Sequence, residues 1–375
     1  MNIALSSIKI EKKVIKLKSI WDLIDEKKLY HFAKIDEVSS HVADVLKNTN
    51  IKYDPIWEIE YQRVENRIIC LMNELENIAQ LLSENNIKIV ALKNAGIAKG
   101  IYNNYACSPM GDIDLLVKSE DFIKAHEIIV NDLGFTFKFR SEFENENLNE
   151  AFRSGGTEYY KFVNGYKIWL ELQWRPIAGR WIQPHNEPNG DKLIDRSIEI
   201  KGSAVRLLSP EDNLLQVSLH TAKHSYVRAP GFRLHSDVDR IVRFQNINWD
   251  HFINLVVHKN LKTSVYFSLY YAKKLLDTPI PMFVFNNLKP KTINYYLIKR
   301  LISKAKVYNQ RNKKFSKIGY IFFNLLLYDS FLEIIKAIFP PLKILREQDD
   351  VDSNWSLILF YVTRIKNLLF QRAKL

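Results

Sequence analysis

The sequence is poor in cysteine, and we identify neither a secretion signal nor an unbroken apolar run in it. Two cysteines, Cys70 and Cys107, cannot form a disulfide framework and lack the spacing of metal ligands, so we expect a reducing, cytoplasmic location. Residues 1–18 alternate apolar residues with lysines and lack a signal-peptide core. Polar and charged residues interrupt the most apolar stretch, 318–339, which favours a buried helix over a membrane span; contact with a membrane surface is the alternative.

Acidic residues are in the minority, and one long segment has none. The chain contains 54 Lys and Arg against 42 Asp and Glu, which gives a formal net charge of +12. Residues 289–317 are rich in Lys and Arg and contain no acid, so they could attract triphosphates, nucleic acid or anionic lipid. We favour a solvated helix face in a lysine-rich protein, because no nucleic-acid-binding module accompanies the segment.

The length of 375 residues, with 47% hydrophobic and 26% charged residues, fits a soluble globular protein of two domains or one domain with large appendages. Apolar spacing predicts helices over 15–50 and 56–83, separated by a break at 48–55. The Asn-Gly pair at 164–165 predicts a hairpin over 157–174. The other expected elements are a strand at 87–92, helices at 95–102 and 119–133, and a mainly helical remainder that begins at the cap residue Ser209.

One short run, Gly111 to Val117, carries two acids that are two residues apart. In a strand, alternate side chains point the same way, so Asp112 and Asp114 would project side by side. Ile113 and Leu115 would enter the core on the opposite face. Adjacent carboxylates repel each other unless a proton or cation lies between them, and Mg²⁺ prefers carboxylate and phosphate oxygens. The pair therefore indicates phosphoryl or nucleotidyl transfer, although the same spacing also occurs in turns and calcium loops.

A third acid falls on a later strand. The alternation over 166–173 places Glu171 on the face opposite the apolar residues of that strand. Three carboxylates can hold two metal ions, which activate an attacking hydroxyl and stabilise a leaving pyrophosphate. Asp112 and Asp114 would share both ions, and Glu171 would hold the ion nearer the acceptor.

Short motifs that extend over much of the chain accompany these acids. They are Leu92-Lys93-Asn94-Ala95-Gly96-Ile97-Ala98 with Tyr102, Pro109 to Val117, Leu170 to Trp174, Leu207 to Asp212, Leu219 to His224, Asp237 to Arg240, and the tail motifs at 339–340 and 361–364. Together they resemble the uncharacterised bacterial nucleotidyltransferase family, within the DNA polymerase beta-like superfamily. The resemblance covers roughly residues 60–370.

The resemblance implies a reaction class and a site. Asp112, Asp114 and Glu171 would be catalytic and would bind the metal, Mg²⁺ or Mn²⁺. The substrate would be an NTP, bound by five residues: Lys93, Asn94, Gly111, His220 and His224. Related chains are found among bacterial peptide-modification and polysaccharide genes, so a modified peptide or a glycan is a reasonable acceptor.

Two positions depart from the pattern of the family. Asn94 stands where the family has a glycine that lets backbone amides approach a triphosphate at a helix N-terminus. Ser108 stands where an arginine is common. We expect both changes to affect the nucleotide pocket more than the metal site. Lys93 is retained, and it could either contact a phosphate or be a solvated lysine at the end of a strand.

Two histidines, His220 and His224, lie four residues apart on one face of a helix. They could bind a phosphate, orient a metal ligand or hold zinc, or they could form a structural pair bonded to carbonyls or to Asp237. No glutamate follows His220 and no third soft ligand is close in sequence, so the zincin pattern is excluded. We interpret Asp237 and Asp239 as structural acids paired with nearby arginines.

We therefore expect an α+β protein with a small mixed-sheet core at 85–205, flanked by helical regions at 1–84 and 206–375. The expected activity is Mg²⁺-dependent transfer of a nucleotidyl group from an NTP to a hydroxyl of a small molecule, a sugar, or a peptide or protein side chain, with release of pyrophosphate. One alternative is a non-catalytic binding protein that keeps the fold. The other is a toxin–antitoxin type nucleotidyltransferase that modifies RNA or a partner protein.

Overall fold

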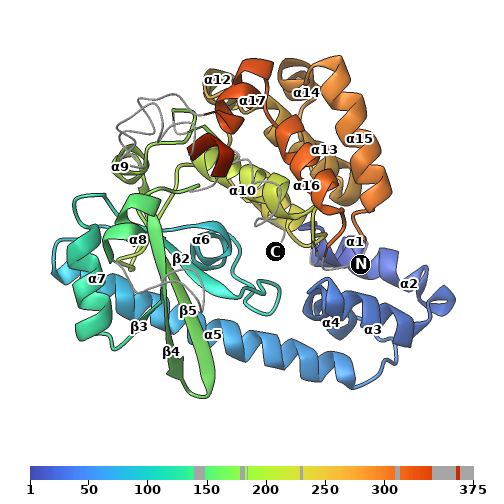
Figure 1. Ribbon diagram of the computed structural model, residues 1–375. Coiled ribbons are helices and arrows are strands. Elements are labelled where there is room, and N and C mark those ends of the chain that lie inside the picture. The colour runs from blue at the N-terminus through green and yellow to red at the C-terminus, as the bar shows by residue number, and fades with distance from the viewer. Residues whose placement is uncertain are drawn as a thin grey trace.

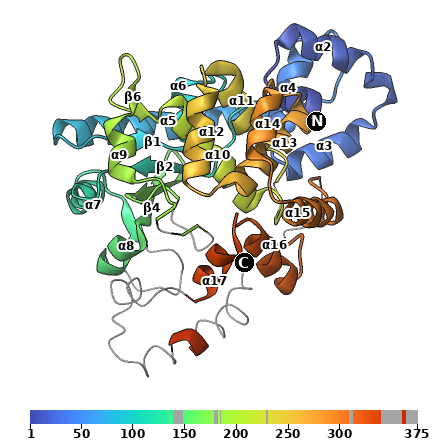
Figure 2. The ribbon, with the colours of Figure 1, turned by 90° about the horizontal axis from the view of Figure 1, so that it is seen from above.

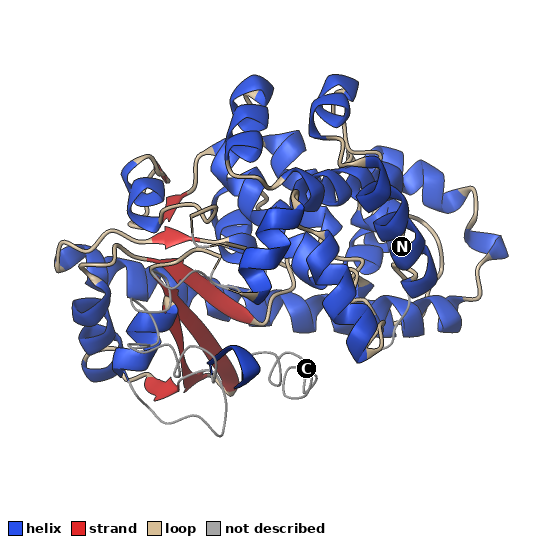
Figure 3. Cartoon of the chain, turned by 45° about the horizontal axis from the view of Figure 1, so that its top comes forward, coloured by secondary structure: helices blue, strands red, loops and turns tan. Residues whose placement is uncertain are grey.

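In the computed structural model a mixed sheet lies on one side of the molecule and helices make up the rest (Figure 1; Figure 3). The structure describes residues 1–138, 148–177, 182–183, 185–228, 231–308, 313–339 and 360–363. Within them the strands are β1 (Val90–Ala91), β2 (Asp112–Leu116), β3 (Thr136–Lys138), β4 (Gly156–Val163), β5 (Tyr166–Gln173), β6 (Ile198–Glu199) and β7 (Arg206–Leu207). Their order is β3-β4-β5-β2-β1-β7-β6. This arrangement confirms the predicted α+β class.

Helices precede the sheet, connect its strands and follow it. Those before the sheet are α1 (Asn2–Leu5), α2 (Ile10–Lys18), the 3-10 helix η1 (Trp21–Leu23), α3 (Glu26–Ile35), α4 (Ser39–Lys47) and α5 (Ile56–Glu84). Those between strands are α6 (Lys93–Gly100), α7 (Phe122–Asn131), α8 (Leu148–Ser154) and α9 (Gly190–Asp195). Those after the sheet are α10 (Pro210–His224), α11 (His235–Phe244), α12 (Trp249–His258), α13 (Lys262–Leu276), α14 (Met282–Leu288), α15 (Thr292–Ala305), α16 (Lys317–Leu326) and α17 (Phe331–Ile338). Figure 2 shows α10 and α11 between the sheet and the helices α2 to α4, whereas α5 packs against the sheet.

Two helical predictions need correction. The region 15–50 is divided into several short helices, because Glu37 takes a left-handed backbone (φ 55°) between α3 and α4 and Asp25 caps a new start for α3. The stretch 318–339 is not one buried helix. It is divided between α16 and α17, because the carboxylate of Asp329 accepts hydrogen bonds from the backbone N–H groups of Lys262 and Thr263 at 2.7 and 2.8 Å.

The hairpin and the acid-bearing strand follow the sequence pattern. Asn164 and Gly165 both have positive φ, 48° and 80°, as a type I′ turn requires, and they join β4 to β5. Ile113 and Leu115 of β2 are fully buried, in the same core as the apolar face of α5. β2 therefore presents Asp112 and Asp114 on its other face, as predicted. None of the helices in the described part of the chain is both long and apolar enough to cross a membrane.

Close packing brings the start of α6 against the sheet. A Cβ atom on Gly96 would overlap the carbonyl oxygen of Ala91 in β1, so only glycine permits this approach. Lys93, the first residue of α6, has a left-handed backbone with φ 51°. These two local features determine where the side chain of Lys93 enters the molecule. The division of the chain at residues 84 and 205 stays a proposal, and α5 shares its core with the sheet.

The end of α3 contains a buried acid. Asp36 is 1% exposed, and neither of its carboxylate oxygens has a hydrogen-bond partner among the described residues. Burial raises the pKa of Asp36 to about 6, against the attraction of Lys314 and with the repulsion of Glu37. An acid whose pKa rises on folding favours the folded state only while it is protonated, so this contribution to stability is lost as the pH rises from about 4 to 6.

We predict that Asp36→Asn makes the protein more stable than wild type at pH 8, by about 1–3 kcal/mol in the free energy of unfolding. The difference should shrink at pH 5, where folded Asp36 is largely protonated. Urea unfolding at the two pH values measures this, with the exposed Asp22→Asn as the matched control. An equal effect of Asp36→Asn at both pH values would contradict the prediction.

Candidate active site

Three carboxylates meet where β2 and β5 run side by side. The two strands are parallel, and their register pairs Asp114 with Glu171 and Asp112 with Trp169. One oxygen from each of Asp112, Asp114 and Glu171 lies within 4.8 Å of the others. Asp114 is buried, Glu171 is half-buried and Asp112 is exposed. The structure thus brings together the three acids that the sequence pattern selected from two distant segments.

Lys93 lies among these acids. Its Nζ donates to Oδ1 of Asp114 at 2.5 Å and to Oε2 of Glu171 at 3.5 Å. Burial alone would lower the pKa of Lys93, but the attraction of Asp114, Glu171 and Asp112 outweighs burial and raises it. The side chain is therefore a charged ammonium ion bound to carboxylates. This excludes the solvated lysine at a strand end, since only 20% of the side chain is exposed, whereas the contact with a phosphate stays a prediction.

The carboxylates do not share this cation equally. Although Asp112 is exposed, the protein that surrounds it reduces its hydration and raises its pKa. Burial raises the pKa of Asp114 well above the usual range, and in both cases the attraction of Lys93 acts in the opposite direction. Burial acts on Glu171 in the same direction, but Lys93 and a hydrogen bond with Asp114 lower its pKa overall. Asp114 is therefore the carboxylate that holds a proton most readily when three acids share one ammonium ion.

Two neighbours of the acids were missed in the sequence. Nε2 of Gln173 donates to Oδ1 of Asp114 at 3.1 Å and fixes the orientation of that carboxylate. Gln173 lies two residues after Glu171, so the same alternation that selected Glu171 could have found it. Nη2 of Arg67 donates to the carbonyl of Gly111 at 3.1 Å, beside Asp112. Arg67 belongs to α5, and no local pattern connects it with the site.

A cavity of about 70 Å³ lies next to the acids. Four of the five residues assigned to nucleotide binding line it: Lys93, Asn94, Gly111 and His220. The fifth, His224, does not line the cavity; its ring packs edge-on against that of His220, with the centroids 4.9 Å apart. Burial lowers the pKa of both histidines well below the usual value, so both rings are neutral.

Two further residues, Arg233 and Asp237, line the same cavity. Nε of Arg233 donates to Glu37 at 2.9 Å, which connects the cavity to the end of α3. Asp239 has the structural role that we expected, since it pairs with Arg243 at 2.8 Å. Asp237 differs, because one of its oxygens has no hydrogen-bond partner in the described part of the chain.

The two departures from the family pattern can now be located. The side chain of Asn94 donates to the carbonyl of Pro109 at 3.2 Å, and the left-handed backbone belongs to Lys93 rather than to Asn94. Ser108 is fully buried and donates to the carbonyl of Asn104 at 2.9 Å. The guanidinium group at the cavity comes from Arg233 instead, which lies in a different part of the chain.

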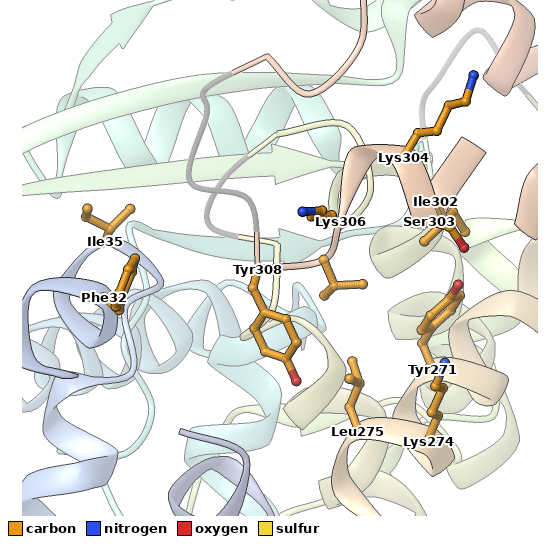
Figure 4. Close-up of a pocket in the computed structure, with 11 residues that line it drawn as sticks. Phe32, Ile35, Tyr271, Lys274, Leu275, Ile302, Ser303, Lys304, Lys306 and Tyr308 are labelled. Carbon is orange, nitrogen blue, oxygen red and sulfur yellow. The ribbon is translucent and has the colours of Figure 1, made fainter. Parts of the chain in front are cut away.

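A larger cavity, of about 1040 Å³, lies away from the acids between α3, α13 and α15 (Figure 4). Its lining includes the aromatic rings of Phe32, Tyr271 and Tyr308 and three lysines, but no carboxylate. Because a lysine-lined cavity offers no ligand for a divalent cation, its size does not make it the candidate active site. The small cavity beside Asp112 and Asp114 is therefore the candidate active site.

A mixed sheet that gathers three carboxylates on neighbouring parallel strands is the core expected of a nucleotidyltransferase. The chain belongs to the uncharacterised nucleotidyltransferase family, whose model matches residues 22–277. This confirms the resemblance read from the motifs. The match begins and ends earlier than the 60–370 that we expected, so the tail motifs at 339–340 and 361–364 lie outside it. Residues 340 and 364 also lie outside the described residues.

Among solved structures, the chain is similar to an antigenic nucleotidyltransferase-like protein from Paracoccidioides brasiliensis. The two are 16% identical, and the alignment covers 58% of this chain and 97% of that one with a TM-score of 0.38. So distant a likeness says nothing about the substrates of this chain. A comparison with curated proteins gave no match.

We predict that Lys93→Met destabilises the metal-free protein by about 2–4 kcal/mol, because it leaves three close carboxylates without their cation. Added Mg²⁺ or Mn²⁺ should then raise the melting temperature of the variant more than that of wild type, since the ammonium ion no longer competes for the same oxygens. Thermal unfolding in EDTA and in a metal titration measures both effects.

The control for this experiment is Lys99→Met, on the same helix. Lys99 pairs with Glu76 outside the cavity. If metal raised the melting temperatures of wild type, Lys93→Met and Lys99→Met by the same amount, competition between Lys93 and a divalent cation would be ruled out.

Proposed function

We propose that this protein is a divalent-metal-dependent nucleotidyltransferase, which moves a nucleotidyl group from an NTP to an acceptor hydroxyl and releases pyrophosphate. The observation that carries the proposal is the group of three carboxylates, Asp112, Asp114 and Glu171, within 4.8 Å of one another. Membership of a nucleotidyltransferase family supports the reaction class. The acceptor is a small molecule, a sugar, or a peptide or protein side chain.

The side chains of the site suit Mg²⁺ or Mn²⁺. Three carboxylates supply only oxygen ligands, which these hard cations prefer. When all three are ionised, Lys93 balances one of three negative charges, and the remaining charge attracts a divalent cation. Bound ions would stabilise the negative charge that develops on the phosphates and on the leaving pyrophosphate.

Each residue then has a defined role. Asp112, Asp114 and Glu171 would hold the ions, and Gln173 keeps the carboxylate of Asp114 in place. With a cation at the three carboxylates, the ammonium group of Lys93 would be available to contact a phosphate oxygen at the start of α6. In the transfer, the acceptor oxygen bonds to the α-phosphorus, the bond to the β-phosphate oxygen breaks, and the acceptor proton passes to a carboxylate or to water.

One observation favours the non-catalytic alternative. The ammonium group of Lys93 already occupies the space between Asp114 and Glu171, so the fold can be stable without metal. A binding protein of this kind would show no metal-dependent NTP binding by calorimetry. The toxin–antitoxin alternative rests on the acid-free segment 289–317 alone. It predicts nucleic-acid binding at physiological salt that is lost when that segment is neutralised.

We predict that Asp112→Asn and Asp114→Asn each reduce nucleotidyl transfer by about 100-fold or more, because each removes a charged ligand of the metal site. The measurement incubates purified protein with labelled NTPs, Mg²⁺ or Mn²⁺, and host lysate as the source of acceptor. Glu199→Gln, an exposed acid at the far edge of the same sheet, is the matched control. Label transfer that survives both aspartate substitutions would refute the metal-site assignment.

A further inference from the structure

The small cavity contains three buried polar atoms without a partner. They are Oδ1 of Asn94, Nδ1 of His220 and Oδ1 of Asp237, and none of them has a hydrogen-bond partner among the residues that the structure describes. All three residues line the same cavity. Asn94 is 8% exposed and Asp237 is 2% exposed. A buried polar atom left unpaired costs free energy, so three around one cavity indicate that polar groups fill it, either water or a polar ligand that displaces the water.

Two of these atoms, Oδ1 of Asn94 and Oδ1 of Asp237, can be satisfied only by a hydrogen-bond donor. The amide of Asn94 is oriented by its own donation to the carbonyl of Pro109, which leaves its oxygen to accept. The unpaired atom of Asp237 is also an oxygen. Arg233 needs an acceptor instead, because its guanidinium group only donates. Among the described residues its hydrogen bond goes to Glu37 through Nε, which leaves other N–H groups for a ligand.

The ligand group must therefore donate and accept at once. A hydroxyl group does both, whereas an ionised phosphate only accepts. A volume of about 70 Å³ is enough for a few hydroxyl-sized groups, such as the edge of a sugar ring.

We propose that the cavity formed by Asn94, His220, Arg233 and Asp237 is a subsite for the hydroxyl groups of a sugar. The identity of the sugar rests on the proposed function, which offers two sources: the ribose of the donor nucleotide and a sugar-like acceptor. Asn94 and Asp237 accept from the hydroxyls and Arg233 donates to them. Asn94, which stands where the family has a glycine, would thus contribute to recognition of the ligand.

The first arm of the test needs no substitution. Calorimetry measures the binding of each NTP in Mg²⁺ or Mn²⁺, beside its 2′-deoxy and 3′-deoxy analogues. If ribose is the source, loss of one hydroxyl should weaken binding about 10- to 100-fold, because it leaves a buried protein atom unpaired. Asn94→Ala should then bind the NTP as weakly as wild type binds the deoxy analogue, and Asp237→Ala repeats the test at a second position.

The second arm detects an acceptor source. In this case the deoxy analogues bind wild type as tightly as the NTP does. Label transfer in lysate falls about 10- to 100-fold in Asn94→Ala and Asp237→Ala, although both variants keep the wild-type affinity for NTP. Asn103→Ala, an exposed asparagine in the loop after α6, is the matched control and leaves both quantities unchanged. If hydroxyl removal and both substitutions affected neither binding nor transfer, the subsite would be refuted.

Failure of the proposed function gives a different result. In that case wild type binds no NTP with either metal and transfers no label. Saturation-transfer NMR with D-ribose at millimolar concentration then decides on the subsite by itself. A ribose signal in wild type and in Asn103→Ala that disappears in Asn94→Ala supports the subsite, and no signal in wild type overturns it.

Discussion

The repulsion among three carboxylates is the constraint on which the site depends. Asp112, Asp114 and Glu171 are held within 4.8 Å of one another by the parallel pairing of β2 with β5, and the sheet gives them no freedom to separate. Positive charge must therefore be supplied from elsewhere. In this structure Lys93 supplies the positive charge. It is the first residue of α6, which can approach the sheet closely because Gly96 has no side chain. Backbone packing and electrostatics are thus two parts of one arrangement.

The cavity beside the acids has a different chemical character. The acids present negative charge to cations. Asn94, His220 and Asp237 instead present polar atoms that have no hydrogen-bond partner among the described residues. Such a division suits a reaction in which phosphate groups must be neutralised while a neutral part of the substrate is recognised beside them. The groups that would recognise the neutral part of the substrate and the groups that bind cations then lie side by side in one small cavity, between the start of α6 and the start of α11.

Much of this arrangement could be predicted from the sequence. Alternation along two strands identified Asp112, Asp114 and Glu171, and the Asn-Gly turn identified the hairpin that contains β5. The contribution of Arg233 and the free oxygen of Asp237 could not be predicted, because both depend on how α10 and α11 dock on α6. The position of Lys93 could not be predicted either, since it follows from a left-handed backbone at a lysine, which no local pattern indicates. The alternation of apolar and polar residues predicted which side chains share a strand face, but it could not predict how separate helices pack on one another.

The ion pair between Arg233 and Glu37 has a consequence for the order in which contacts form during synthesis. Its two residues are separated by 196 positions in the chain, and a hydrogen bond from the backbone of Ser7 to Asp239 spans 232. Contacts of such long range form late in folding, because a large loop must close before they are gained. During synthesis these contacts of Glu37 and Ser7 can form only after residues 233 and 239 have left the ribosome. The ion pair that connects Arg233 of the cavity wall to Glu37 is therefore made only when more than half of the chain has been synthesised.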